Sequence, residues 1–290
     1  MRGGGIEAKS LRKAVVPTSL IPNPSPASFQ SNRLALHVSP DSCCCSIYVA
    51  SGCHTYNLEI SVEDSSLTKG KESLLIPQPA QVLSSSIVDR CPHRSEVQSV
   101  VLSETDCDGC LVLGTVDSHG HLLVSRLVTT SPDFDGVTYS VLPRDSGVGE
   151  GSWAGLCFSP SQWSTAAVAH SFGKSIDVYD QEIHIRSLHT WSALSRWMNC
   201  SKYEITGLAF SSLDSDYIYV QGVDYEVFCG NWRDNKKVFS FRGDSNWLGF
   251  SKCSSNDTLG GWCDSGSIFV ADVVEKGLQP DNGTADGFSS

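Results

Sequence analysis

Short apolar runs separated by polar turns recur along the chain in groups that resemble one another. In the two clearest groups an apolar run ends in Phe-Ser, at Ser211 and again at Ser251, and two further β-rich runs follow it. The two serines are 40 residues apart, which is about the length of one four-stranded blade of a β-propeller. This repeat predicts an all-β scaffold of blades.

Positions inside the groups also match. Asp224 and Asp264 each lie 13 residues after the serine of their own group. Trp232 and Asp272 each lie 21 residues after the same serines, and in a third group Asp180 also lies 21 residues after Ser159. About five blades are therefore visible, and propellers contain about 4 to 8 of them. The serines that mark the five groups are Ser39, Ser103, Ser159, Ser211 and Ser251.

The second group illustrates the expected blade. Residues 97–103 and 111–116 are predicted strands, and the tight turn Asp117-Ser-His-Gly120 leads into a third strand over residues 122–127. Residues 137–142 fit an outer strand. The group therefore predicts four antiparallel strands in chain order.

The chain is predicted to consist of a propeller domain over residues 34–274 between two disordered tails. Residues 1–33 combine basic residues, serines and a proline cluster, which suits an extended segment. Residues 275–290 form the C-terminal tail of this scheme.

Three stretches, over residues 151–180, 195–210 and 217–230, resemble plant members of the WD-repeat (transducin-like) superfamily whose molecular role is unassigned. The resemblance covers nearly the whole chain beyond the N-terminal tail, and it implies degenerate WD-like blades. It also implies further blades between the equivalents of Leu188 and Trp191. The chain is then a shortened form, such as a splice form, that lacks about two blades of a seven-bladed ring.

The signature dipeptides of that superfamily are weak in this chain. Only Trp232-Arg233-Asp234 approaches the terminal Trp-Asp, and Gly120-His121 lies in an internal turn, where it cannot serve as the usual Gly-His pair. Membership is therefore predicted from spacing and overall similarity, and closure of the ring stays an open question.

The formal charge of −11, from 21 Lys and Arg against 32 Asp and Glu, opposes nonspecific binding to a nucleic-acid backbone. No apolar run approaches the roughly 18 residues of a membrane helix, and no apolar segment near the start indicates secretion. We therefore expect no nucleic-acid or membrane partner, a cytoplasmic or nuclear location, and mostly reduced thiols. The basic N-terminal segment leaves organelle targeting as the alternative.

The strongest metal-like pattern is Cys107-Asp-Gly-Cys110 followed by His119 and His121. A C-x2-C turn supplies two zinc ligands, but the spacing of the two histidines differs from the usual H-x3-5-H. We interpret these residues as two surface turns with ordinary thiols, so that no metal and no cofactor is predicted and the four residues stay weak candidates.

Catalysis has no specific support in the sequence. No G-x-S-x-G elbow lies between a strand and a helix, and the carboxylates at predicted turns are most simply solvated. We therefore predict that the protein is not an enzyme, with no catalytic and no cofactor-binding residue.

Tryptophan and arginine side chains are the better candidates for partner contacts, because such side chains concentrate binding energy when they are exposed. Packing of the tryptophans between blades is the alternative. The candidates are Trp191, Arg196, Trp197, Trp232, Arg233 and Trp247. The sequence thus predicts a noncatalytic WD-repeat propeller scaffold that mediates protein-protein interactions; the alternatives are a propeller enzyme or metal-binding propeller, and a truncated form that does not close.

Overall fold

The computed structural model of the chain is built from β-strands, and the prediction of an all-β fold is confirmed. It describes residues 5–21, 32–38, 44–62, 67–70, 74–88, 93–105, 110–128, 138–142, 154–159, 162–170, 176–180, 205–214, 216–222, 224–231 and 233–276. Every named element in these ranges is a strand. Within the same ranges, no helix is long and apolar enough to cross a membrane.

Five sheets of three or more strands have the size of propeller blades. The first sheet contains β2 (Leu34–Val38), β3 (Cys44–Ser51), β4 (His54–Ser61) and β8 (Val82–Ile87). The second contains β9 (Val97–Glu104), β10 (Cys110–Asp117), β11 (Leu122–Val128) and β12 (Thr138–Val141). The third contains β13 (Ala154–Ser159), β14 (Gln162–His170) and β15 (Ile176–Asp180).

The fourth and fifth sheets complete the set. The fourth contains β16 (Ile205–Phe210), β17 (Tyr217–Gly222), β18 (Glu226–Asn231) and β19 (Lys236–Arg242). The fifth contains β20 (Trp247–Lys252), β21 (Thr258–Cys263) and β22 (Ser267–Glu275), with β1 (Ile6–Val15) beside β22 and β7 (Gln78–Pro79) at the edge. A small sheet pairs β5 (Thr68–Lys69) with β6 (Leu75–Ile76).

The strand β1 overturns part of the predicted N-terminal tail. It pairs antiparallel with β22 from Ile6 to Val15, and Ile6, Ala8 and Leu11 are buried in one core cluster. The prediction of disorder is therefore wrong for residues 6–15. The apolar alternation of this short stretch is interrupted by a bulge between Ala8 and Ser10, and its partner strand lies far away in the sequence.

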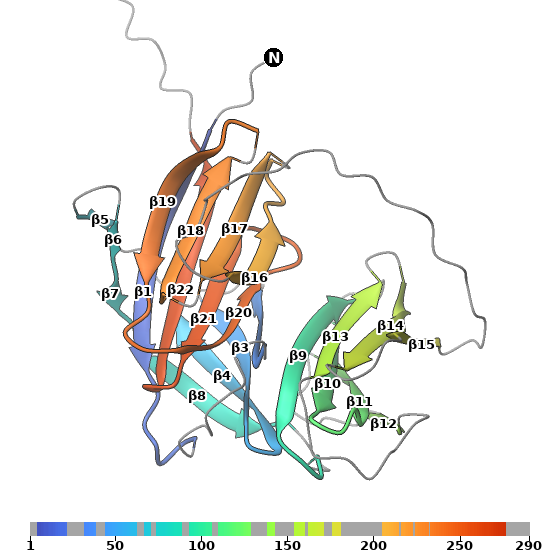
Figure 1. Cartoon of the computed structure of the whole chain (residues 1–290). Coiled ribbons are helices and arrows are strands. Elements are labelled where there is room, and N and C mark those ends of the chain that lie inside the picture. Colours follow the sequence, from blue (N-terminus) through green and yellow to red (C-terminus); the bar gives the residue numbers. More distant parts are fainter. Residues whose placement is uncertain are drawn as a thin grey trace, which may run out of the picture.

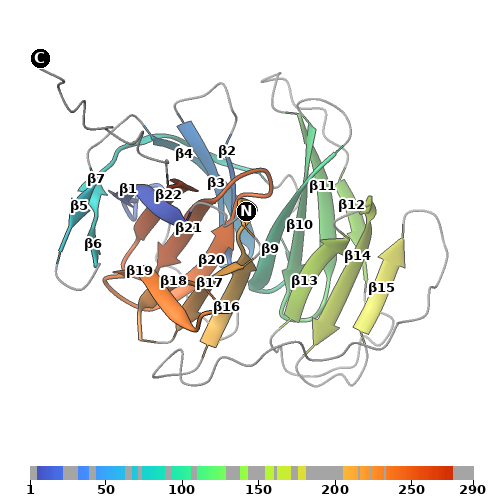
Figure 2. The same cartoon turned by 90° about the horizontal axis from the view of Figure 1, so that it is seen from above.

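Neighbouring sheets pack flank against flank around a common centre (Figures 1 and 2). Strand β2 of the first sheet packs against β20 and β21 of the fifth sheet and against β9 of the second, while β13 of the third sheet packs against β9 and β10. At this last contact a Cβ on Gly114 would lie 2.6 Å from the ring of Phe158. The glycine therefore allows the second and third sheets to approach closely.

The ring of sheets is incomplete, as expected for a degenerate propeller. Among the described residues, no strand of the third sheet packs extensively against a strand of the fourth. Figure 2 shows these two sheets apart. On β16, Leu208 and Phe210 are 61% and 60% exposed. We refer to these two side chains as the open flank, because they lie on the strand where a further sheet would pack.

Candidate functional site

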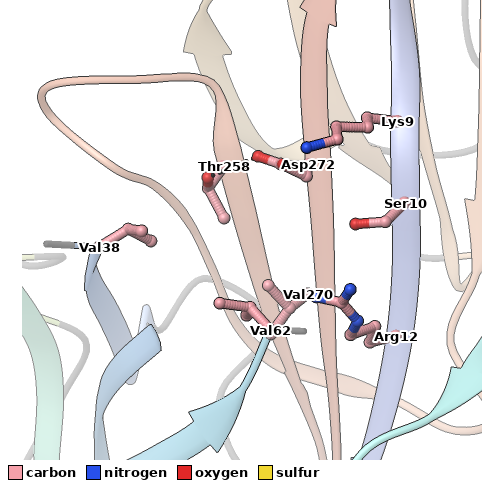
Figure 3. Close-up of a pocket in the computed structure, with 8 residues that line it drawn as sticks. All are labelled: Lys9, Ser10, Arg12, Val38, Val62, Thr258, Val270 and Asp272. Atoms are coloured by element: carbon pink, nitrogen blue, oxygen red, sulfur yellow. Dashed lines mark hydrogen bonds between the residues drawn. The ribbon is translucent and has the colours of Figure 1, made fainter. Parts of the chain in front are cut away.

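A small pocket lies where the fifth sheet meets the first (Figure 3). Three of its residues come from β1, three from β21 and β22, and two from the ends of β2 and β4. The lining residues are Lys9, Ser10, Arg12, Val38, Val62, Thr258, Val270 and Asp272. The pocket therefore combines an apolar wall of three valines with a polar wall supplied largely by β1.

The bulge in β1 brings the polar side chains of this strand to the pocket. Ala8 and Leu11 both point into the same core cluster, although an uninterrupted strand would place residues three apart on opposite faces. The extra residue thus lets Lys9 and Ser10 both line the pocket, in the way that bulges re-aim side chains elsewhere. Figure 3 shows Lys9, Ser10 and Arg12 extending from β1 on the same side.

Arg12 is the unusual member of the pocket because it is only 6% exposed. Asp272, the carboxylate among the lining residues, accepts a hydrogen bond of 3.0 Å from the Thr258 hydroxyl. None of the described residues forms a hydrogen bond or ion pair with the Arg12 guanidinium. The guanidinium stays charged and faces the pocket without an anion paired to it among the described residues, so the pocket is suited to a negatively charged ligand group.

A second polar cluster lies at the turn between β10 and β11. His93 and Asp117 are 3% and 0% exposed, and His121 is partly buried beside them. The Nδ1 atom of His93 lies 3.5 Å from Asp117 Oδ2, and the Nδ1 atom of His121 lies 3.9 Å from the same oxygen. Three groups that bind metals or protons thus converge at one end of the second sheet.

The protonation of this cluster follows from its surroundings. Burial acts to raise the pKa of Asp117, but interactions with the His93 ring and with the backbone N–H groups of His121 and His119 outweigh it and lower the pKa to about 2. Burial and the neighbouring His93 ring lower the pKa of His121 below its usual range. At neutral pH the cluster therefore holds an ionised carboxylate beside a neutral His121 ring.

A third cluster joins the fourth and fifth sheets. Asp257, 1% exposed in the loop between β20 and β21, accepts hydrogen bonds from the hydroxyls of Tyr219 and Ser211 and from the backbone N–H of Ser212. The Tyr219 bond measures 2.6 Å, and Lys252 Nζ lies 3.6 Å from the carboxylate. All of these donors are engaged with one carboxylate, which fits a structural link between the two sheets.

The structure separates the metal candidates taken from the sequence. Cys107 lies outside the described residues. Cys110 begins β10, whereas His119 and His121 lie beyond its far end, and seven residues of strand span roughly 23 Å. The described members of the C-x2-C and H-x-H pattern therefore do not meet in one site, and His121 instead faces His93 and Asp117.

Most of the candidates for partner contacts, namely Trp191, Arg196, Trp197 and Trp232, lie outside the described residues. Arg233 forms an ion pair with Asp216. Trp247 packs beside a core cluster, with edge-to-face contacts to Phe241 and Phe269. Trp247 of β20 therefore packs against Phe241 of the fourth sheet and Phe269 of the fifth.

The sequence did not predict Arg12, the buried arginine of the pocket, or His93, the buried histidine beside Asp117 and His121. Arg12 was assigned to a tail, and the signal that could have found it is the apolar pattern of Ile6, Ala8 and Leu11 around it. His93 lies in a loop before β9 and has no partner close in sequence. Its role depends on a contact with Thr115, 22 residues away.

Comparisons with known proteins do not identify a family for this chain. No family model matches the chain, and no curated protein matches it. A solved structure titled "Crystal Structure of Mitotic Checkpoint Complex" contains a chain with 11% sequence identity and a TM-score of 0.40, and the match covers 91% of this chain and 94% of that one. The resemblance to the plant WD-repeat superfamily therefore stays a prediction.

Proposed function

We propose that the protein is a noncatalytic propeller scaffold that binds a protein partner, and that an acidic side chain of the partner enters the pocket between the first and fifth sheets. The observation that carries this proposal is the guanidinium of Arg12, a residue only 6% exposed, which faces the pocket and has no anionic partner among the described residues. Arginine stays charged in proteins and donates two parallel hydrogen bonds to a carboxylate.

The shape of the pocket favours a side chain of a protein over a free metabolite. Val38, Val62 and Val270 provide an apolar wall against which the methylene groups of a glutamate can pack, while its carboxylate reaches Arg12. The pocket is too small to enclose a larger ligand, and ligand sites usually bury most of the ligand surface. The remaining contacts of a protein partner would spread over the rims of the neighbouring sheets.

Binding of this kind needs no chemical step. Rigid blades present loops and strand ends to a partner, and Arg12 is held on the paired strand β1. A preformed cation of this kind loses little conformational freedom on binding. The proposed role is therefore recognition, with no catalytic residue and no cofactor.

The thiols of the core support a cytoplasmic or nuclear location as part of this proposal. The described cysteines form no disulfide, and burial raises the pKa of Cys45, Cys229 and Cys263. Such thiols are poor nucleophiles, and cysteines without disulfides are typical of a reducing compartment. Imaging of a C-terminally tagged chain would test this placement, and accumulation in an organelle or outside the cell would contradict it.

The proposed function can be tested with an array of short peptides in which every glutamate-containing sequence is paired with its glutamine counterpart. We expect the purified protein to bind a subset of the acidic peptides and to bind their glutamine counterparts at least about 10-fold more weakly, because a charge-assisted hydrogen bond contributes about 1.5–3 kcal/mol. Arg12→Gln should abolish this preference, and Arg12→Lys should keep part of it.

The matched control is Arg242→Gln, which removes an exposed arginine at the end of β19 and should leave the preference unchanged. Thermal unfolding of each variant shows whether it is folded. A folded wild-type protein without preference for acidic peptides would refute the proposal, as would an Arg12→Gln variant that keeps the preference.

A further inference from the structure

We propose that His93, Asp117 and His121 form a binding site for Zn²⁺ in the second sheet. Each of the three side chains offers one ligand atom within 4.8 Å of the other two, and the atoms that face one another are Nδ1 of each histidine and Oδ2 of the aspartate. All three atoms are buried, and none has a hydrogen-bond partner among the described residues. Buried polar atoms are nearly always paired, so three orphaned ligand atoms at one point indicate a missing ligand.

The spacing of the atoms suits a tetrahedral ion. Zinc binds nitrogen and oxygen ligands at about 2.0–2.2 Å, which places two ligands of a tetrahedron roughly 3.4 Å apart. The two separations from Asp117 Oδ2, 3.5 Å to His93 Nδ1 and 3.9 Å to His121 Nδ1, are close to this value. A contraction of a few tenths of an ångström would complete three corners of the tetrahedron.

The far side of each ligand is already held in place. His93 Nε2 lies 2.7 Å from Thr115 Oγ1, and His121 Nε2 lies 2.7 Å from Ser140 Oγ. When the Nε2 proton of each ring is donated to these hydroxyls, Nδ1 presents a lone pair to the centre of the cluster. Metal-binding histidines usually have such an outer partner, which fixes the tautomer and the ring orientation.

Hydrogen bonds on its outer oxygen also hold the carboxylate of Asp117 in place. Asp117 Oδ1 accepts hydrogen bonds of 3.0 Å from the backbone N–H groups of His119 and His121. These two bonds fix the carboxylate in the turn and leave Oδ2 directed toward the histidines. The turn itself depends on Gly120, whose φ of 78° lies in the left-handed region that favours glycine.

Hydrogen bonds within the cluster do not satisfy these atoms. Ordinary N–H···O hydrogen bonds measure about 2.7–3.2 Å, and both separations from Asp117 Oδ2 are longer. The two histidine rings meet edge to face, with centroids 5.4 Å apart. A cation between the three atoms would pair all of them at once.

Another group with metal-binding side chains among the described residues is formed by His37, Glu104 and Cys253. Its carboxylate already accepts a hydrogen bond of 2.6 Å from the Ser254 hydroxyl, and neither its histidine nitrogens nor its carboxylate oxygens are buried without a partner. The cluster in the second sheet is therefore the stronger site.

Two imidazoles and one carboxylate are a ligand set that zinc prefers over magnesium or calcium, which favour oxygen ligands. The His121 side chain is 14% exposed, so a water molecule can reach the fourth position from the surface. The bound ion would connect the loop before β9 to the turn after β10. The site belongs to the second sheet and is independent of the Arg12 pocket, so either proposal can fail without the other.

The test is isothermal titration of the EDTA-treated, dialysed full chain with zinc sulfate, together with elemental analysis of the protein as purified. We expect one strongly bound equivalent of zinc and a rise in the melting temperature when zinc is added, because ligands that bind the folded state stabilise it. Substitution with Co²⁺ should give the visible absorption of a tetrahedral site.

The variant His121→Ala should weaken zinc binding at least about 100-fold and remove the rise in melting temperature. The matched control is His119→Ala, which changes an exposed histidine of the same turn and should bind zinc like the wild type. His37→Ala should also bind normally. Absence of a strong equivalent in the wild type, or equal losses in His119→Ala and His121→Ala, would overturn the proposal.

Discussion

The two sides of this incomplete ring differ in how their sheets are covered. Within the fifth sheet β1 pairs with β22, and two large core clusters fill its flanks toward the first and the fourth sheets. An ion pair of 2.7 Å also joins Lys13 of β1 to Asp244 in the loop between β19 and β20. At the open flank, by contrast, Leu208 and Phe210 of β16 are exposed. The difference shows that a blade flank is buried only where a neighbouring sheet packs on it.

The stability of the protein should therefore come mainly from the interfaces between neighbouring sheets, which run from the fourth sheet through the fifth, first and second sheets to the third. Substitutions of residues buried in these interfaces are expected to be costly, and substitutions on the open flank are expected to be tolerated. Four measurements test this comparison.

The largest effect is expected in the core cluster between the fourth and fifth sheets, to which β1 contributes Leu11. Leu11 of β1 is 1% exposed, and replacing a buried leucine by alanine costs about 2–5 kcal/mol. We expect Leu11→Ala to lower the free energy of unfolding by such an amount in urea titrations. Val15→Ala, in the same strand at 60% exposure, should change it by less than about 0.5 kcal/mol. Equal effects would show that β1 does not seal the fifth sheet in solution.

The next effect is expected where the fourth sheet joins the fifth. Asp257→Ala leaves the buried Tyr219 hydroxyl and the backbone N–H of Ser212 without their acceptor, and each such loss costs about 1–3 kcal/mol. We expect a loss of about 3 kcal/mol in the free energy of unfolding. Asp234→Ala, at an exposed turn, is the control, and a similar loss there would remove the distinction.

A smaller and pH-dependent effect is expected in the second sheet. The pKa of Asp117 is lowered from 3.8 to about 2 in the folded protein. Its contribution, on the order of 2 kcal/mol, is fully present above pH 4 and is lost as the pH falls toward 2. In EDTA, Asp117→Asn should therefore be less stable than the wild type at pH 6, and the two should converge near pH 2. A difference that is independent of pH would contradict this assignment.

The smallest effect is expected at the open flank. Leu208→Ser changes a side chain that is 61% exposed, so its free energy of unfolding should shift by less than about 0.5 kcal/mol. Leu248→Ser, 2% exposed on β20, should cost several times more. If Leu208→Ser proves as damaging as Leu248→Ser, the flank is covered in solution and the ring is more complete than the described residues show.

The sequence predicted the blades well where a strand and its partner are close neighbours. The expected strands over residues 97–103 and 111–116 correspond to β9 and β10, and the tight turn at Asp117 is confirmed by the positive φ of Gly120. Local alternation and turn residues were sufficient in these hairpins, because each strand pairs with the next one along the chain.

The features that the sequence did not predict depend on residues far apart in the chain. The strand β1 becomes recognisable only beside β22. Arg12 becomes a candidate binding residue only because β2, the segment after β4, and β22 supply the valines of its pocket. His93 likewise acquires its role through Thr115 and Asp117. The periodicity of a single segment does not show which distant segment it will contact. The pattern of apolar residues therefore predicts the blades but not the sites that form between or within them.

The pairing of β1 with β22 has a consequence for biosynthesis. Strand β1 is synthesised before the strands of the other four sheets, and its partner β22 is synthesised after them. Until β22 is made, the apolar side chains of β1 have no partner strand, and contacts between such distant segments form slowly. The nascent protein therefore needs β22 before β1 can join a sheet, so a truncation before β22 would also leave Ile6, Ala8 and Leu11 without their partner strand.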